Sequence, residues 1–125
     1  MFDSDNIEGV EVLRKEIPEN IQYWNRFGRI SELYYSHLSD ESGEYVCCID
    51  MTLADTSDKY RIKLTLFNVS GKISFDMVNG FYSGFSIDDL TTSGCERDCR
   101  FHIYSSEQDI GFDIYCERIK AVLTQ

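Results

Sequence analysis

The sequence predicts a mainly β protein, on the border of α+β, in which about seven antiparallel strands follow a short N-terminal helix. Three observations lead to this fold class. From residue 30 onward, apolar residues recur at every second position, which is the period of a half-buried strand. The alternating segments are short and separated by polar turns, so crossover helices have no room. Each segment also has one apolar and one polar parity.

Before Pro18 the apolar residues are spaced by three or four positions, which places them on one face of a helix. Asp5 or Asn6 is in place to cap the first turn, and Gly9 weakens the helix. Pro18 ends it, because the residue before a proline avoids the helical region. The residues from there to Gly28 have no clear period. The apolar stripe consists of Ile7, Val10, Leu13 and Ile17.

The expected strands begin at residue 30, in a segment rich in aromatic residues. The third strand alternates up to Leu66, but its parity slips by one at Phe67 and Val69, which indicates a bulge or a bend. Residues 119–123 either continue the sheet after a bulge or form a terminal helix. In order, the expected strands cover residues 30–38, 45–53, 60–69, 73–77, 81–90, 99–104 and 110–117.

Short polar turns join these strands into an antiparallel meander. Ser70 and Gly71 are expected to turn the chain, and Asn79-Gly80 is a strong hairpin signal. Each strand has one apolar and one polar side, so one face of the sheet is buried and the other meets water. A strongly curved sheet, a sandwich and a partly open barrel all fit this pattern.

Length, composition and charge exclude several classes of protein. The 125 residues fit a single domain over residues 1–125. No apolar run approaches the roughly 20 residues that span a bilayer, and the N-terminus lacks the features of a signal peptide, so we expect a cytoplasmic protein. The formal net charge is −10. With no visible cluster of Lys and Arg, this charge argues against nucleic acid and anionic membranes as partners.

The five cysteines are an odd number and do not suggest a disulfide framework. A zinc set of Cys95, Cys99, Cys116 and His102 has loose spacing. Cys99 and Cys116 also fall on the apolar side of their strands, where a free cysteine packs as a small hydrophobe. We therefore expect no metal site and no cofactor. From the same alternation we expect Cys47 in the core and Cys48 as its outward neighbour.

No catalytic motif stands out, and we do not expect an enzyme. His37 and His102 lie neither in a metal-binding histidine pair nor beside a candidate nucleophile. His102 falls on the outward side of its strand, and we expect both histidines to be exposed strand residues. A pair of carboxylates at the right distance would suffice for a hydrolase. However, the acidic residues concentrate in turns and on the polar sides of strands, which is where solvated charges belong.

Acidic and aromatic residues near the C-terminal turns are the best candidates for a binding surface. Neighbouring aromatic residues on one strand cannot both face the core, and exposed aromatic residues flanked by acids are typical of protein-binding faces. The expected partner-binding residues are Tyr82, Asp88, Asp89, Glu96, Asp98, Glu107 and Asp109.

The second half of the chain, residues 60–123, ends its strand pattern with the sequence FDIYCERI at residues 112–119. This pattern resembles the small bacterial immunity proteins of polymorphic toxin and contact-dependent inhibition systems. Several of those families close a similar meander with a strand of the form F-x-(I/C)-x-(C/A)-x-x-I. The segments that carry the resemblance are residues 66–69, 73–75, 84–90, 100–104 and 110–119.

The resemblance implies that the chain binds a cognate toxin domain and blocks its active site. It implies no catalytic residues. Many such toxins are nucleases with basic clefts, and an acidic inhibitor complements a basic cleft.

Two other functions stay open. One is a small-ligand-binding β-barrel or sandwich with an aromatic cavity near Trp24. The other is a structural module that forms homo-oligomers through a sheet edge.

Overall fold

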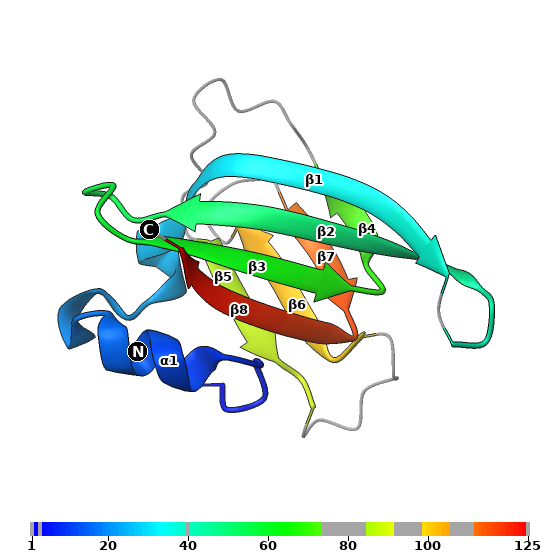
Figure 1. Cartoon of the computed structure of the whole chain (residues 1–125), viewed down its shortest axis with the longest axis horizontal. Helices are drawn as coiled ribbons and strands as arrows, with labels where there is room; N and C mark the ends of the chain where they lie inside the picture. The colour runs from blue at the N-terminus through cyan, green and yellow to red at the C-terminus, as the bar shows by residue number, and fades with distance from the viewer. Residues whose placement is uncertain are drawn as a thin grey trace.

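The computed structural model describes residues 2, 4–39, 41–73, 85–91, 99–105 and 112–124. In this part of the chain it contains one α-helix, two 3-10 turns and eight strands (Figure 1). The helix α1 covers Val10–Glu16, and the 3-10 turns cover Glu19–Ile21 and Trp24–Phe27. The strands are β1 Arg29–Ser39, β2 Tyr45–Ala54, β3 Arg61–Phe67, β4 Ser70–Ile73, β5 Phe85–Asp89, β6 Phe101–Ser105, β7 Phe112–Cys116 and β8 Arg118–Thr124.

The strands form two four-stranded antiparallel sheets, which confirms the expected fold class. Sheet A has the order β1-β2-β3-β8, and sheet B has the order β4-β7-β6-β5. In Figure 1 sheet A lies in front of sheet B, and the strands of the two sheets cross. The order differs from that of a simple meander, because β8 returns from sheet B to pair with β3.

Two bent segments carry the chain between the sheets. β3 leads into β4 across Asn68 and Val69, and β7 leads into β8 across Glu117. Asn68 has a φ of 59°, a left-handed conformation that turns the chain sharply. Because β3 pairs with β8 and β4 pairs with β7, the same two segments stay neighbours on both sides of the bend. The bend predicted from the parity slip is therefore confirmed.

The expected turn at Ser70 and Gly71 is wrong. Both residues lie in β4, where they pair with Tyr115 and Ile114 of β7. Gly71 has a φ of 115°, and a Cβ atom at this position would lie 2.8 Å from the Cα atom of Ile114. Glycine is needed here because β4 approaches β7 closely. The stretch after residue 118 is strand β8 and not a terminal helix.

The helix α1 is shorter than expected, because Gly9 precedes it as the N-cap with a φ of 89°. The expected caps Asp5 and Asn6 are wrong, since no side chain caps this helix. The helix does end before Pro18, as predicted. No helix in the described part of the chain is long and apolar enough to cross a membrane.

The residues before α1 add a short parallel contact to the edge of sheet A. The backbone N–H of Glu8 donates to the carbonyl of Ile119 at 2.9 Å, and the N–H of Ala121 donates to the carbonyl of Glu8 at 2.7 Å. This contact covers part of the outer edge of β8. The N-terminal segment thereby closes one side of the space between the sheets.

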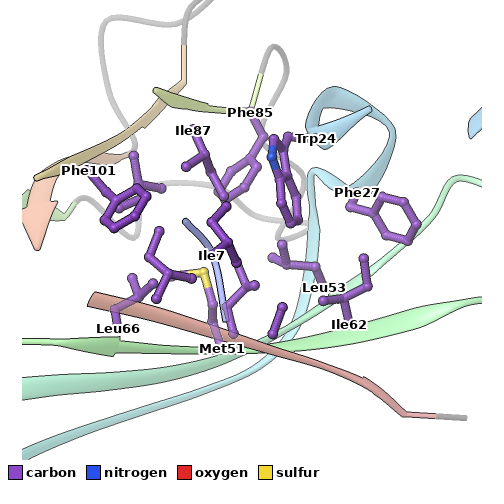
Figure 2. Close-up of a cluster of buried hydrophobic side chains, with 14 of the residues drawn as sticks. Ile7, Trp24, Phe27, Met51, Leu53, Ile62, Leu66, Phe85, Ile87 and Phe101 are labelled. Atoms are coloured by element: carbon purple, nitrogen blue, oxygen red, sulfur yellow. The ribbon is translucent and has the colours of Figure 1, made fainter. Parts of the chain in front are cut away.

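A single hydrophobic core draws side chains from both sheets and from α1. Figure 2 shows Phe85 and Ile87 of β5 across from Met51 and Leu53 of β2. Both β5 residues are buried, as their alternation predicts. Trp24 also belongs to this core, with its ring centroid 4.4 Å from that of Phe2.

The expected pattern of one buried and one exposed face does not hold in β1 or at one end of β2. Most side chains of β1 are exposed on both faces. In β2 the predicted roles of the two cysteines are reversed, because Cys48 is buried and Cys47 is only half-buried. Cys48 lies between Ser36 of β1 and Phe67 of β3 on the outer face of sheet A. Cys47 lies on the inner face, where it lines an open groove beside β4.

Candidate functional site

The seven expected partner-binding residues are only partly within the described structure. Asp88 and Asp89 lie in β5, at the edge of sheet B. The other five fall outside the described residues, and they are Tyr82, Glu96, Asp98, Glu107 and Asp109. The candidate site is therefore built from Asp88 and from the side chains that the neighbouring strands place around it.

Asp88 belongs to a group of polar and aromatic side chains on the outer face of sheet B, which we name the His102 cluster. The strand register brings its members together: His102 of β6 lies opposite both Asp88 and Tyr115, and Tyr104 lies opposite Asp113. The cluster thus spans β5, β6 and β7. It consists of Asp88, His102, Tyr104, Asp113 and Tyr115.

The rings of the His102 cluster form a stack. The His102 ring lies between Tyr104 and Tyr115, with ring centroids 4.4 Å apart on each side and interplanar angles of 21° and 7°. Nε2 of His102 lies 2.7 Å from a carboxylate oxygen of Asp113. The Tyr104 hydroxyl donates to Asp88 at 3.0 Å. Both polar contacts run diagonally across the strands and orient the rings of His102 and Tyr104, whereas Tyr115 is held by its stack on His102.

The carboxylates of the cluster remain available to solvent. Asp88 is exposed, and the Asp113 side chain is 71% exposed, whereas the side chain of His102 is only 21% exposed. Partial burial, together with the hydrogen bond and charge of Asp88, raises the pKa of Tyr104, so this phenol stays a neutral donor at physiological pH. The cluster therefore presents two acceptor groups beside fixed aromatic rings, which suits contact with Arg or Lys side chains.

Asp89 has a different role from Asp88. Its carboxylate accepts hydrogen bonds from Ser4 at 2.6 Å, Asn6 at 2.8 Å, and the backbone N–H and hydroxyl of Thr91 at 2.9 and 2.6 Å. Partial burial acts to raise the pKa of Asp89, but these hydrogen bonds outweigh it and lower the pKa to about 2. Asp89 is thus an internal anchor between the N-terminal segment and β5, and its contact with a partner stays a prediction.

Four of the five cluster residues were not among the residues that we expected from the sequence to bind a partner. His102 was expected to be exposed but is half-buried, and Tyr104, Asp113 and Tyr115 were not expected to bind. A usable signal was present, because these residues occupy the polar sides of two consecutive strands. Adjacent antiparallel strands place such residues in cross-strand contact once the register is known. The alternation alone did not supply that register.

The zinc set considered from the sequence is not assembled around His102. Cys116 is fully buried on the inner side of β7, whereas His102 points to the outer face and contacts Asp113. Cys99 precedes β6 and is half-buried, and Cys95 lies outside the described residues. Among the described residues, no group of three or more His, Cys, Asp or Glu side chains could hold a metal ion.

Basic side chains gather on the opposite surface of the molecule, although the sequence showed no such cluster. They alternate with buried residues along β3 and β8, so they share the outer face of sheet A. Arg61 forms an ion pair with Asp58, and Arg118 lies over the Phe67 ring. The basic residues on this face are Arg61, Lys63, Arg118 and Lys120.

A groove of about 450 Å³ lies between β1 and β2 of sheet A and β4 and β7 of sheet B. Its polar rim includes the Tyr35 hydroxyl, which is 3.0 Å from Nε2 of His37. Partial burial raises the pKa of the Cys47 thiol, so the thiol is protonated at neutral pH. Trp24 does not line this groove. The lining consists of Leu33, Tyr35, His37, Cys47, Ile49, Val69, Ser70, Gly71 and Ile114.

Comparison of the chain with protein-family models, with curated proteins and with solved structures gave no match.

Proposed function

We propose that this protein is a cytoplasmic immunity protein, which binds a cognate bacterial toxin domain and blocks its active site. The observation that carries the proposal is the His102 cluster, where Asp88 and Asp113 stand beside three stacked rings. Rigid aromatic residues flanked by charged groups are the usual centres of protein-binding surfaces. The protein acts by binding, and the cluster has no catalytic role.

Charge supports a basic partner. A formal charge of −10 attracts a basic surface over long distances, and the two exposed carboxylates of the cluster give that attraction a local target. A nuclease toxin has a basic cleft for its phosphate substrate, and acidic side chains in that cleft would compete with nucleic acid. The rings contribute contact area at a low cost in conformational entropy, because the sheet already holds them.

The direct test is co-expression with the toxin domain encoded by the neighbouring gene, combined with a pull-down between the two proteins. We expect a stable complex and protection of the host cells. Absence of both binding and protection for every toxin domain encoded next to this gene contradicts the proposal.

The site itself is tested by removing its charges. The double variant Asp88→Asn and Asp113→Asn should weaken binding by about tenfold, since each exposed charge pair contributes up to about 1 kcal/mol. The matched control is Glu16→Gln with Glu19→Gln, which removes the same charge from exposed positions at the end of α1 and in the turn after it. Equal weakening by both double variants would show that only net charge matters and would refute this site.

Binding of a small ligand is a second candidate function, which the groove beside Tyr35 and His37 favours. The apolar side chains of Leu33, Ile49 and Ile114 line it, with a hydroxyl and an imidazole at the rim. This combination suits a small neutral aromatic molecule.

Titration with phenol and with indole tests the groove. Binding there should shift the methyl NMR signals of Leu33, Ile49 and Ile114 and leave that of Val122 unchanged. Unchanged groove signals would exclude both probes. Fluorescence of Trp24 is a poor reporter, because Trp24 lies in the core and not in the groove.

A further inference from the structure

The longest strand of the protein, β1, lies at an edge of sheet A. Among the described residues β1 pairs only with β2, so its other edge presents backbone N–H and C=O groups without strand partners. All of its eleven residues are exposed or half-buried. Such an edge is a template for pairing with another strand.

The C-terminal part of this edge lacks the usual protection against pairing. Natural edge strands carry lysines, prolines or bulges that prevent association. Residues 33–39 of β1 read LYYSHLS and contain no Lys, Arg, Asp, Glu or Pro, although 27% of the chain is charged. The only register irregularity in the pairing of β1 with β2 lies between Ile30 and Glu32, ahead of this segment. The edge is therefore competent to pair along seven consecutive residues.

Large apolar side chains gather at the same place. Tyr34, Tyr35 and Leu38 of β1 are 63%, 59% and 52% exposed, and Tyr45, opposite the end of β1, is 78% exposed. These residues are four of the seven large hydrophobic side chains that are exposed in the described part of the chain. Exposed apolar surface concentrated in this way marks an interaction site.

We propose that β1 pairs with β1 of a second copy of this chain, in antiparallel orientation, and joins two copies of sheet A into one eight-stranded sheet. The net charge of −10 makes two copies repel each other over long distances, so an uncharged contact favours self-association. Residues 33–39 provide one. A twofold axis also lets both copies use the same edge at once, which closes the assembly at a dimer.

The register follows from the extent of the uncharged segment. All seven residues are paired when the axis passes through Ser36, the centre of the segment. Tyr34 then lies opposite Leu38 of the second copy on the outer face of sheet A, and Tyr35 lies opposite His37 of the second copy on the inner face. Aromatic–aliphatic and tyrosine–histidine neighbours are favourable cross-strand pairs. The His102 cluster lies in the other sheet, so the dimer leaves it accessible.

Sedimentation velocity of the full chain over a range of concentrations tests the dimer. We expect a species of twice the 14.5 kDa monomer mass. The double variant Tyr34→Lys and Leu38→Lys should raise the dissociation constant more than about tenfold, because the register places like charges opposite each other twice. Val122→Lys is the matched control, since Val122 is an exposed apolar residue of the same sheet but lies on β8. Circular dichroism verifies that each variant is folded.

A charge-swapped variant tests the register. Tyr34→Lys combined with Leu38→Glu should dimerise again, because the register places Lys opposite Glu in both pairs. Residues 34 and 38 of one strand are about 13 Å apart, so a nuclear Overhauser contact between the Tyr34 ring and the Leu38 methyl groups must be intermolecular. A monomer at all concentrations up to about 1 mM, a dimer that survives the double Lys variant, or a charge-swapped variant that stays monomeric overturns the proposal.

Discussion

Both carboxylate oxygens of Asp89 accept hydrogen bonds in the folded protein. Ser4, Asn6 and Thr91 all donate to it, although Ser4 and Asn6 are more than 80 residues away in sequence. These contacts tie the start of the chain to the edge strand of sheet B. Asp88, the neighbouring residue, points to the other side of β5 and joins the His102 cluster. Alternation along one strand thus separates an anchoring role from a surface role.

We predict that Asp89→Asn lowers the free energy of unfolding by about 1–2 kcal/mol at neutral pH. The pKa of Asp89 is lowered from 3.8 to about 2 in the folded protein, so its contribution is complete above the unfolded pKa. It is lost as the pH falls toward about 2. The difference between wild type and variant should therefore shrink on acidification. Urea unfolding at several pH values measures it.

Asp58→Asn is the control for this prediction, because the Asp58 carboxylate is half-exposed and has a single ion pair, with Arg61. Its effect should stay below about 1 kcal/mol. If the two variants lose equal stability, or if the Asp89 effect persists unchanged at low pH, the anchoring role is refuted.

At the scale of elements, the contact between the N-terminal segment and β8 depends on Gly9. Its φ of 89° suits glycine, and a Cβ atom at this position would collide with the carbonyl oxygen of Ala121. That residue also takes part in the parallel bridge with Glu8. The segment can therefore lie against β8 only if residue 9 has no side chain.

Gly9→Ala should lower the free energy of unfolding by about 3 kcal/mol or more, through backbone strain and loss of the bridge. Gly43→Ala is a close control, because Gly43 has a φ of 86° but no neighbouring atom within 4 Å of the added Cβ. It should lose only about 1 kcal/mol from strain. Chemical unfolding of both variants separates the effect of the collision from that of backbone strain. If the two variants lose similar free energy of unfolding, the contact with β8 is unimportant for stability.

Most of the strands could be predicted, because alternation is a property of neighbouring residues. Phe85 and Ile87 were placed correctly on the inner side of their strand, and the bend after Phe67 followed from a slip in parity. Gly71 was misread as a turn, because a glycine in a close strand contact looks the same in sequence as a glycine in a turn. Only the pairing of β4 with β7 distinguishes the two.

At the scale of the whole molecule, both sheets depend on one core. Phe85 of sheet B is fully buried in the same hydrophobic cluster as Met51 of sheet A. Phe85→Ala should therefore lower stability by about 3–5 kcal/mol. We also expect hydrogen exchange to show that amides of both sheets lose protection together. Val122→Ala, at an exposed position of β8, should have little effect. Loss of protection in sheet B alone would contradict a shared core.

The charge of the whole molecule predicts the kinetics of partner binding. If the toxin partner is basic, its association rate should fall roughly tenfold or more as ionic strength rises from low to physiological, since salt screens long-range attraction. The dissociation rate should change much less. Stopped-flow measurements at several salt concentrations test this. A rate that does not depend on salt argues against electrostatic attraction between the two proteins.

The alternation of apolar and polar residues was enough to predict the mainly β class, the positions of most strands and the inner sides of the central ones. Each of these follows from the alternation of apolar and polar residues between neighbouring positions in the chain. Tertiary structure decided which strands are neighbours, and with that the stack of His102 between two tyrosines, the reversed burial of Cys47 and Cys48, and the exposure of β1. The physical reason is that burial and cross-strand contact depend on residues brought close from distant parts of the chain. The alternation within one strand does not show which distant residues will lie next to it.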